Sequence, residues 1–281
     1  MAYAGDTVRL GTEGAYPPWN FINDAGEVDG FEREVGDELC KRAKLTCEWV
    51  VNDWDSIIPN LVSGNYDAII AGMSITDERD EVIDFTTNYS QPDPSAYLAL
   101  SNDVDLAGGV IAAQSNTIQS GYIATTSATL VEFSTPEETL AAVRNGEADA
   151  VLADKSFLAP IAAENADLML MGDNIMLGGG VGMGIRESDG ELKDKFSAAI
   201  DSMKADGSLN ALITKWEIGE TFESSSGEGP CALCHPPDNL PPSSPVSGPT
   251  RYRSKPRRGP PSLRPVLTPN YCLRCNGCRV T

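Results

Sequence analysis

Arg79 and the polar turn before it could bind a carboxylate group. The stretch 67–89 opens with the apolar pattern of a buried strand and continues into the small-residue turn Gly72–Ser74. Thr76 can cap a helix that begins after this turn, and Arg79 lies one turn further on. Free N–H groups at a helix N-terminus and the planar two-donor fork of arginine both favour a bound carboxylate. The alternative is that Arg79 is a surface residue paired with its acidic neighbours.

Histidine chemistry is excluded from the main body of the chain. The only histidine is His235, and it lies in the segment 223–281, which holds 12 of the 19 prolines and lacks helical or strand periodicity. We expect this segment to be disordered or a non-native, for example frame-shifted, extension. Cys231–His235 has the form of a c-type haem site, and Cys272–Cys278 could bind zinc. No predicted fold surrounds either motif, so we expect neither a metal nor a cofactor.

The body of the chain is strongly acidic. Residues 1–222 of the 281-residue chain include 13 Lys or Arg and 38 Asp or Glu. Such a surface repels nucleic acid and anionic lipid and attracts cationic ligands, although a high-salt habitat would explain it equally well. No stretch approaches the 18 apolar residues of a membrane span. Ala2–Ala4 has the small-x-small form of a signal-peptidase site, which suggests an exported protein.

Strands and helices alternate along the chain. Strands are expected at 7–10, 46–51, 67–71, 109–113 and 148–154, and helices at 31–43, 54–63, from Thr135, at 189–206 and at 209–216. The helix at 54–63 is expected to begin with Asp53 or Asp55. This alternation predicts an α/β fold with parallel sheets and helices on both faces. Ligands of such sheets bind at the carboxyl ends of strands, where Glu13, Gly72 and Ser74 fall.

An ordered series of motifs resembles the extracytoplasmic solute-binding proteins of polar amino-acid ABC transporters. The matching residues are Gly11–Trp19, Gly30-Phe31, Trp54, Ile58-Pro59, Tyr66–Ala68, and Met73–Thr76 with Arg79. The match runs from about Val8 to about Thr221 and is most similar to the lysine/arginine/ornithine, histidine and opine binders. It implies a two-lobed type II periplasmic-binding-protein fold. It also implies a monomeric periplasmic receptor that delivers a cationic L-amino acid to a membrane ABC permease.

The resemblance also gives an interpretation of the domain organisation. We expect lobe 1 to comprise 5–94 and 186–222, and lobe 2 to comprise 95–185. The Pro-rich segment 91–95 and the Gly-rich strand 178–184 are interpreted as the two crossovers. Discontinuous lobes joined by two crossovers predict hinge closure over a cleft.

The resemblance implies a binding residue for each of the two charged groups of an amino-acid backbone. Arg79 would hold the α-carboxylate, helped by the turn of Gly72, Met73 and Ser74 and by the Asn116-Thr117 turn of the second lobe. Asp154 aligns with the family acid that binds the α-ammonium. The alternative for Asp154 is a strand-end residue that caps the next helix.

The resemblance places the ligand side chain against Glu13. A buried carboxylate at that end of the pocket would select a lysine ammonium or a guanidinium. Tyr16 and Trp54 could sandwich the methylene stem, unless Trp54 is an ordinary core residue. The family's serine pair is here Ala71-Gly72. The extra space also suits an opine, and histidine, glutamine and glutamate remain possible ligands. An enzyme on the same fold, such as a dehydratase with Glu13 or Asp154 as acid or base, is the less favoured alternative.

Cys40 and Cys47 are the two cysteines in the body of the chain. On one continuous helix their Cα atoms would lie about 10 Å apart, beyond the roughly 7 Å that a disulfide spans. A bridge therefore requires the helix to end between them, which the pattern allows. Two buried thiols are the alternative, but the resemblance implies a disulfide at this place.

Overall fold

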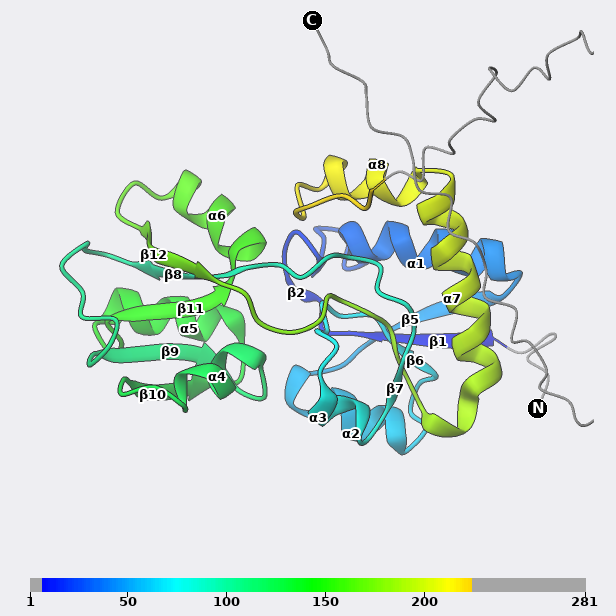
Figure 1. Ribbon diagram of the computed structural model, residues 1–281, viewed down its shortest axis with the longest axis horizontal. Coiled ribbons are helices and arrows are strands. Elements are labelled where there is room, and N and C mark those ends of the chain that lie inside the picture. Colours follow the sequence, from blue (N-terminus) through cyan, green and yellow to red (C-terminus); the bar gives the residue numbers. More distant parts are fainter. Residues whose placement is uncertain (1–6, 224–281) are drawn as a thin grey trace, which may run out of the picture. The chain divides into compact units, whose positions relative to one another are not determined.

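The computed structural model describes residues 7–223. Their helices are α1 (Phe31–Ala43), η1 (Trp54–Ser56), α2 (Ile57–Val62), α3 (Asp77–Asp80), α4 (Ile118–Ile123), α5 (Pro136–Asn145), α6 (Lys155–Glu164), η2 (Glu187–Asp189), α7 (Gly190–Ala205) and α8 (Ser208–Lys215). Their strands are β1 (Thr7–Thr12), β2 (Ala15–Tyr16), β3 (Asn20–Ile22), β4 (Val28–Asp29), β5 (Thr46–Val51), β6 (Ala68–Ile69), β7 (Asp84–Phe85), β8 (Ser95–Ala99), β9 (Val110–Gln114), β10 (Thr129–Phe133), β11 (Ala150–Asp154), β12 (Met169–Ile175) and β13 (Gly184–Ile185) (Figure 1). The haem-like and zinc-like motifs predicted at 231–235 and 272–278 lie outside these residues.

Each of the two lobes contains a mainly parallel five-stranded sheet. The strand order is β5-β1-β6-β13-β7 in the first and β10-β9-β11-β8-β12 in the second. In the first sheet only β13 runs against the others, and in the second only β8 does. β2, β3 and β4 form a small antiparallel sheet of their own. The predicted α/β class with mainly parallel sheets is therefore confirmed.

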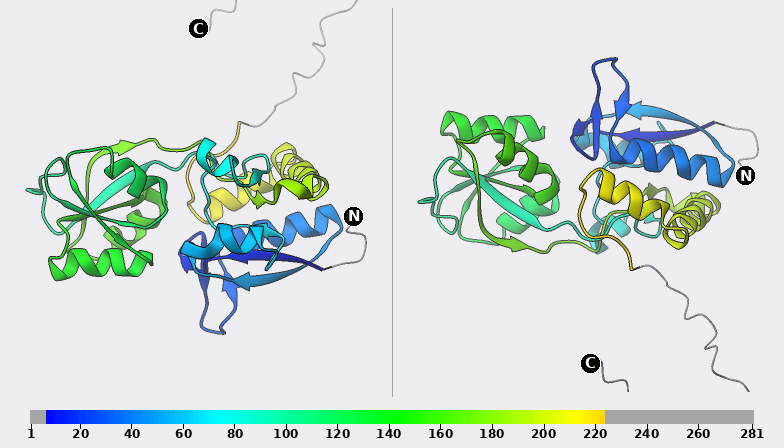
Figure 2. Two further views of the ribbon diagram at one scale, coloured as in Figure 1. Left: turned by 90° about the horizontal axis from the view of Figure 1, so that it is seen from below. Right: turned by 90° about the horizontal axis from the view of Figure 1, so that it is seen from above.

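Helices cover both faces of each sheet because neighbouring strand residues point to opposite sides. In the first sheet Leu10 packs with α1, α7 and α8, whereas Ile69 packs with α2. In the second sheet Leu98 packs with α5 and α6, whereas Tyr97 and Ala99 pack on the side of α4. Figure 2 shows the sheets and helices of residues 7–223 from two further directions. The C-terminal helices α7 and α8 therefore return to the first sheet, as the sequence predicts. No helix within residues 7–223 is long and apolar enough to cross a membrane.

Two crossovers join the lobes, at 86–94 between β7 and β8 and at 176–183 between β12 and β13. They lie side by side, since the Tyr89 N–H donates to the Val181 carbonyl at 2.8 Å. The predicted strand at 178–184 is mostly irregular, because only its last residue enters β13. β13 pairs within the first sheet, although 184–185 fall inside the predicted second lobe. The lobe bounds 5–94 with 186–222 and 95–185 stay a prediction.

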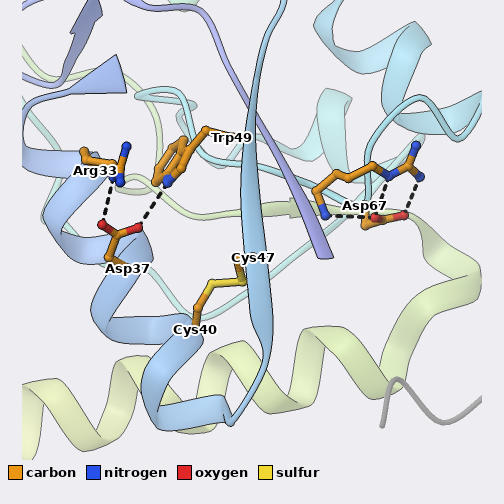
Figure 3. The surroundings of a disulfide bond; sticks show 7 residues. Arg33, Asp37, Cys40, Cys47, Trp49 and Asp67 are labelled. Carbon is orange, nitrogen blue, oxygen red and sulfur yellow. Dashed lines mark hydrogen bonds and ion pairs between the residues drawn. A yellow bond between two sulfur atoms is a disulfide. The ribbon is translucent and has the colours of Figure 1, made fainter. Parts of the chain in front are cut away.

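A disulfide joins Cys40 to Cys47 with 6.2 Å between their Cα atoms (Figure 3). α1 ends at Ala43, Lys44 takes a left-handed conformation with φ 56°, and β5 begins two residues later. This turn brings the two cysteines together and confirms the implied bridge. The helix predicted at 54–63 is divided into the short η1 and α2. Asp53 occupies the position before η1, as one of the two predicted starts requires, but neither Asp53 nor Asp55 caps a helix with its side chain.

Candidate functional site

A cavity lies between the lobes, where β1 and β6 of one sheet and β9 and β11 of the other end. Its lining residues are Glu13, Tyr16, Trp54, Ala71, Gly72, Ser74, Arg79, Gln114, Thr117, Ile118, Gln119 and Asp154. This is the edge at which parallel α/β sheets bind ligands. The structure therefore brings together eight of the ten residues predicted to bind ligand.

Arg79 is fixed by neutral carbonyl groups from both lobes. Thr76 caps α3 by accepting a hydrogen bond from the Arg79 backbone N–H at 3.2 Å. The guanidinium donates to the Ser74 carbonyl at 2.8 Å and to the Asn116 carbonyl at 3.0 Å. Burial lowers its pKa to about 10, so it stays charged at neutral pH. Within residues 7–223 it forms no ion pair, so a bound carboxylate can serve as its counterion.

Asp154 ends β11 and occupies the position before α6, but its side chain does not cap that helix. Instead its carboxylate accepts hydrogen bonds from the Tyr16 hydroxyl at 3.0 Å and from the Gln119 amide at 2.8 Å. Burial and the nearby charge of Asp93 raise its pKa to about 7, despite these donors and the positive charge of Arg79. The carboxylate is thus held at the cavity wall rather than used as a cap.

Glu13 follows β1 and is 9% exposed. Its carboxylate accepts a hydrogen bond from the Gln114 amide of the second lobe at 2.6 Å. Burial raises its pKa to about 7, the Gln114 bond opposes this, and the charges of Asp55 and Asp53 add to it. A positive group placed against Glu13 would relieve this unfavourable burial of charge.

Trp54 and Tyr16 both line the cavity, each with one ring face already in contact. The Arg79 guanidinium lies over the Trp54 ring at 5.5 Å from its centroid. Trp54 is also 8% exposed and packs in the cluster around α2, so it is both a core residue and a cavity residue. Tyr16 stacks on Phe157, with ring centroids 4.3 Å apart. A ligand stem can therefore contact only the remaining surface of either ring.

The sequence model of the family of bacterial extracellular solute-binding proteins, family 3, matches residues 8–220. This chain belongs to that family. The match contains every cavity residue, and it confirms the predicted relationship and the exported location that the family implies.

Two relatives and one solved structure agree with this membership. An L-arginine-binding protein of Pseudomonas aeruginosa is 33% identical over 79% of this chain and 92% of that protein. An octopine-binding periplasmic protein of Rhizobium meliloti is 32% identical over 75% and 90%, respectively. The crystal structure of a periplasmic His/Glu/Gln/Arg/opine family-binding protein from Silicibacter pomeroyi in complex with lysine is 72% identical. That alignment covers 76% of this chain and 99% of the other, with a TM-score of 0.75.

Four cavity residues of this family member were not predicted as ligand-binding: Ala71, Gln114, Ile118 and Gln119. Gln114 ends β9 as Glu13 follows β1, so the strand-end rule could have found it. Gln119 lies in the first turn of α4, a helix that Thr117 caps by accepting from the Ser120 N–H at 3.1 Å. No sequence signal marks its hydrogen bond to Asp154.

Two predicted ligand residues lie off the cavity. The side chain of Met73 is fully buried in the cluster around α2. Asn116 takes a left-handed conformation with φ 58°, and its amide donates to Asp55 at 3.0 Å. Both line a neighbouring groove that shares Trp54 and Arg79 with the cavity. Asn116 is linked to the predicted ligand site only through its backbone carbonyl, which accepts a hydrogen bond from Arg79.

Asp55 connects the lobes beside this groove. It follows Trp54 in η1 and accepts hydrogen bonds from the Ser115 hydroxyl at 2.7 Å and the Asn116 amide at 3.0 Å. The sequence interpretation offered Asp53 or Asp55 as the start of a helix, so this contact between the lobes was missed.

The cavity as a whole has one cation, Arg79, and two carboxylates, Glu13 and Asp154, which come from different elements. This arrangement can bind a zwitterion that carries a second positive charge.

Proposed function

We propose that this protein captures a cationic L-amino acid between its lobes and delivers it to a membrane ABC permease. The observation that carries the proposal is the placement of Arg79, Asp154 and Glu13 on one cavity. Arg79 binds the α-carboxylate, Asp154 the α-ammonium and Glu13 the side-chain cation. Names of relatives that bind arginine or octopine, and the lysine-bound structure, support this ligand class.

The proposal includes a monomeric, non-catalytic receptor. One chain supplies every residue of the cavity, so no second copy is needed to complete it. Glu13 and Asp154 are the residues that an enzyme on this fold would use, and we assign both to ligand binding. Incubation of each amino acid with the protein, followed by NMR, is expected to return it unchanged. A new product would favour the dehydratase-like alternative.

An opine is the second candidate ligand, because there is space beside Gly72. A Cβ atom at this position would meet only the Tyr16 ring, at 4.0 Å. Octopine is an arginine whose α-nitrogen carries a carboxyethyl group, and this space lies in the cavity where such a group could fit. Asp154 favours the simple amino acid, since a free α-ammonium gives it more hydrogen-bond donors.

The Glu13→Gln substitution tests the assignment of the side-chain end. Lysine and arginine affinity is expected to fall by about 100-fold, because truncating a buried charge pair costs roughly 2–5 kcal/mol. Affinity for norleucine, which lacks the terminal ammonium of lysine, is expected to change far less. Titration calorimetry on the refolded full chain, with ornithine, histidine, glutamine, glutamate and octopine in the panel, measures this.

The exposed residue Glu27 provides the matched control. Glu27→Gln makes the same chemical change away from the cavity and should leave every affinity unchanged. Equal losses for lysine and norleucine in Glu13→Gln would show that Glu13 does not face the side-chain cation. Binding of octopine alone by the wild-type protein would move the assignment to an opine receptor.

Lysine affinity is also expected to fall as the pH drops below 7. Burial raises the pKa of both Glu13 and Asp154 to about 7, whereas a bound cation favours their carboxylate forms. Binding therefore releases protons, and each protonated carboxyl weakens affinity about tenfold per pH unit below its pKa. The folding stability of the protein without ligand depends on pH in the opposite direction. Because the two pKa values are raised in the folded state, stability falls as pH rises from about 4 to 7.

Calorimetry between pH 5.5 and 8.5, in buffers of different ionisation enthalpy, measures this proton release. Glu13→Gln should remove its share of the pH dependence and leave that of Asp154. An affinity that is constant between pH 5.5 and 8.5 would contradict the coupling.

A further inference from the structure

Glu32 carries a buried carboxylate that does not line the cavity. It is the second residue of α1 and is 0% exposed. One oxygen accepts from the Asn20 amide at 2.7 Å, and the other accepts from the Gly72 N–H at 2.6 Å and from the Tyr89 hydroxyl. Within residues 7–223 it has no cationic partner. Burying a charge among neutral donors is costly, so stability alone is a weak reason for its presence.

The network around Glu32 reaches two turns that form the cavity. The Asn20 side-chain carbonyl accepts a hydrogen bond from the Gly14 N–H at 2.7 Å, directly after Glu13. Gly72 is itself a cavity residue in the turn that leads to Ser74. Both glycines have left-handed backbones, with φ 72° and 61°, which other residues rarely adopt, so both turns depend on glycine at these positions. Glu32 therefore connects the Glu13 turn to the Gly72 turn through hydrogen bonds alone.

The third donor connects Glu32 to the crossovers. Tyr89 lies in the first crossover, and its backbone N–H donates to Val181 of the second. Its ring is fully buried and its hydroxyl donates to Glu32. The carboxylate thus fixes the two cavity turns relative to the segments that join the lobes.

We propose that Glu32 is a positioning residue that sets the spacing between the Glu13 end and the Gly72–Ser74 end of the ligand site. It acts through Asn20, Gly72 and Tyr89 and does not touch the ligand. This inference rests on the proposed function for the identity of the ligand, but the network itself does not depend on it.

The direction of the hydrogen bonds gives a specific test. In Glu32→Gln one carboxylate oxygen becomes an NH₂ group, which then faces the Asn20 NH₂ group. If the Asn20 amide rotates to accept, its NH₂ group faces the Gly14 N–H instead. Adding Asn20→Asp resolves the conflict, because a carboxylate at position 20 accepts from both Gly14 and the new amide. The new amide oxygen still accepts from Gly72 and Tyr89.

Glu32→Gln is expected to weaken lysine binding by about 10- to 100-fold, because the turns that carry Glu13 and Gly72 lose the hydrogen bonds that set their spacing around the ligand. The double variant Asn20→Asp/Glu32→Gln is expected to restore affinity to within about threefold of wild type. Glu34→Gln is the matched control, because Glu34 also lies in the first turn of α1 but pairs with Lys215. It removes the same charge and should leave affinity unchanged.

Amide NMR provides a readout that needs no ligand. The Gly72 amide proton should move upfield in Glu32→Gln because it loses a charged acceptor. The Gly14 amide proton should move downfield in the double variant because it gains one. Thermal unfolding, measured in parallel, separates these effects from a general loss of stability.

The outcomes separate this inference from the proposed function. A wild-type protein that binds none of the amino acids refutes the proposed ligand class, while the amide shifts still test the network. Unchanged affinity in Glu32→Gln, or a double variant that stays as weak as the single one, would overturn the positioning role. If Glu32→Gln fails to fold, the lysine affinity of the double variant tests the positioning role instead: an affinity close to that of wild type supports the role, and a much weaker one overturns it.

Discussion

Arg79→Ala is expected to weaken binding of every L-amino acid by about 100- to 1,000-fold, because truncating one partner of a buried charge pair costs roughly 2–5 kcal/mol. Arginine has five N–H donors, and the Ser74 and Asn116 carbonyls account for two contacts. The remaining donors can hold an α-carboxylate with the two-pronged geometry that lysine cannot reproduce. Arg79→Lys should therefore recover only part of the loss.

The loss in Arg79→Ala should be equal for lysine and norleucine, since the α-carboxylate is common to both. Titration calorimetry on the full chain measures it, and thermal unfolding checks that the variant folds. Arg144→Ala is the control, because Arg144 is exposed and pairs with Asp167 outside the cavity. A loss below about fivefold would rule out direct binding of the carboxylate by Arg79.

Asp154→Asn is expected to weaken lysine binding by about 30- to 300-fold, because the α-ammonium loses its counterion in a site shielded from water. The asparagine keeps an oxygen that can accept from Gln119, and the Tyr16 hydroxyl can turn to accept from the new amide. The surrounding hydrogen bonds can therefore persist, which separates loss of charge from loss of structure.

A ligand without the α-ammonium makes this test specific. 6-Aminohexanoate keeps the carboxylate and the terminal ammonium of lysine, so its weaker binding should be nearly the same in wild type and Asp154→Asn. Asp173→Asn, at an exposed position of β12, is the control substitution. Equal losses for lysine and 6-aminohexanoate would show that Asp154 acts on something other than the α-ammonium.

The features that sequence could predict are those set by one element at a time. The alternation of strands and helices predicted the sheets. The strand-end rule placed Glu13 at the ligand-binding end of its strand, and the family resemblance assigned Arg79 and Asp154 to the same site. The family resemblance implied the disulfide, and the sequence pattern allows it because a helix end and a strand start lie only three residues apart. Each of these depends on short-range pattern or on a motif that keeps its spacing.

The missed features depend on how distant segments meet. Asp55 looks like a helix cap in sequence, but Ser115 and Asn116 of the other lobe take up its carboxylate. Met73 lies in a polar turn, yet its side chain points into the core, whereas its neighbours Gly72 and Ser74 line the cavity. Gln119 gains its role only because α4 brings it to Asp154. Local patterns carry no information on such pairings.

The Asp55 contacts have a consequence for how this receptor can be tuned. They join the lobes without lining the cavity, so they contribute equally to closure around any ligand. The apparent affinity scales with the fraction of molecules in the binding-competent arrangement. Substitutions that weaken this contact but keep the charge of Asp55, which also acts on Glu13, should therefore change all dissociation constants by one common factor; Ser115→Ala is an example. The ratio between ligands is set elsewhere, so scavenging strength and ligand choice can evolve independently.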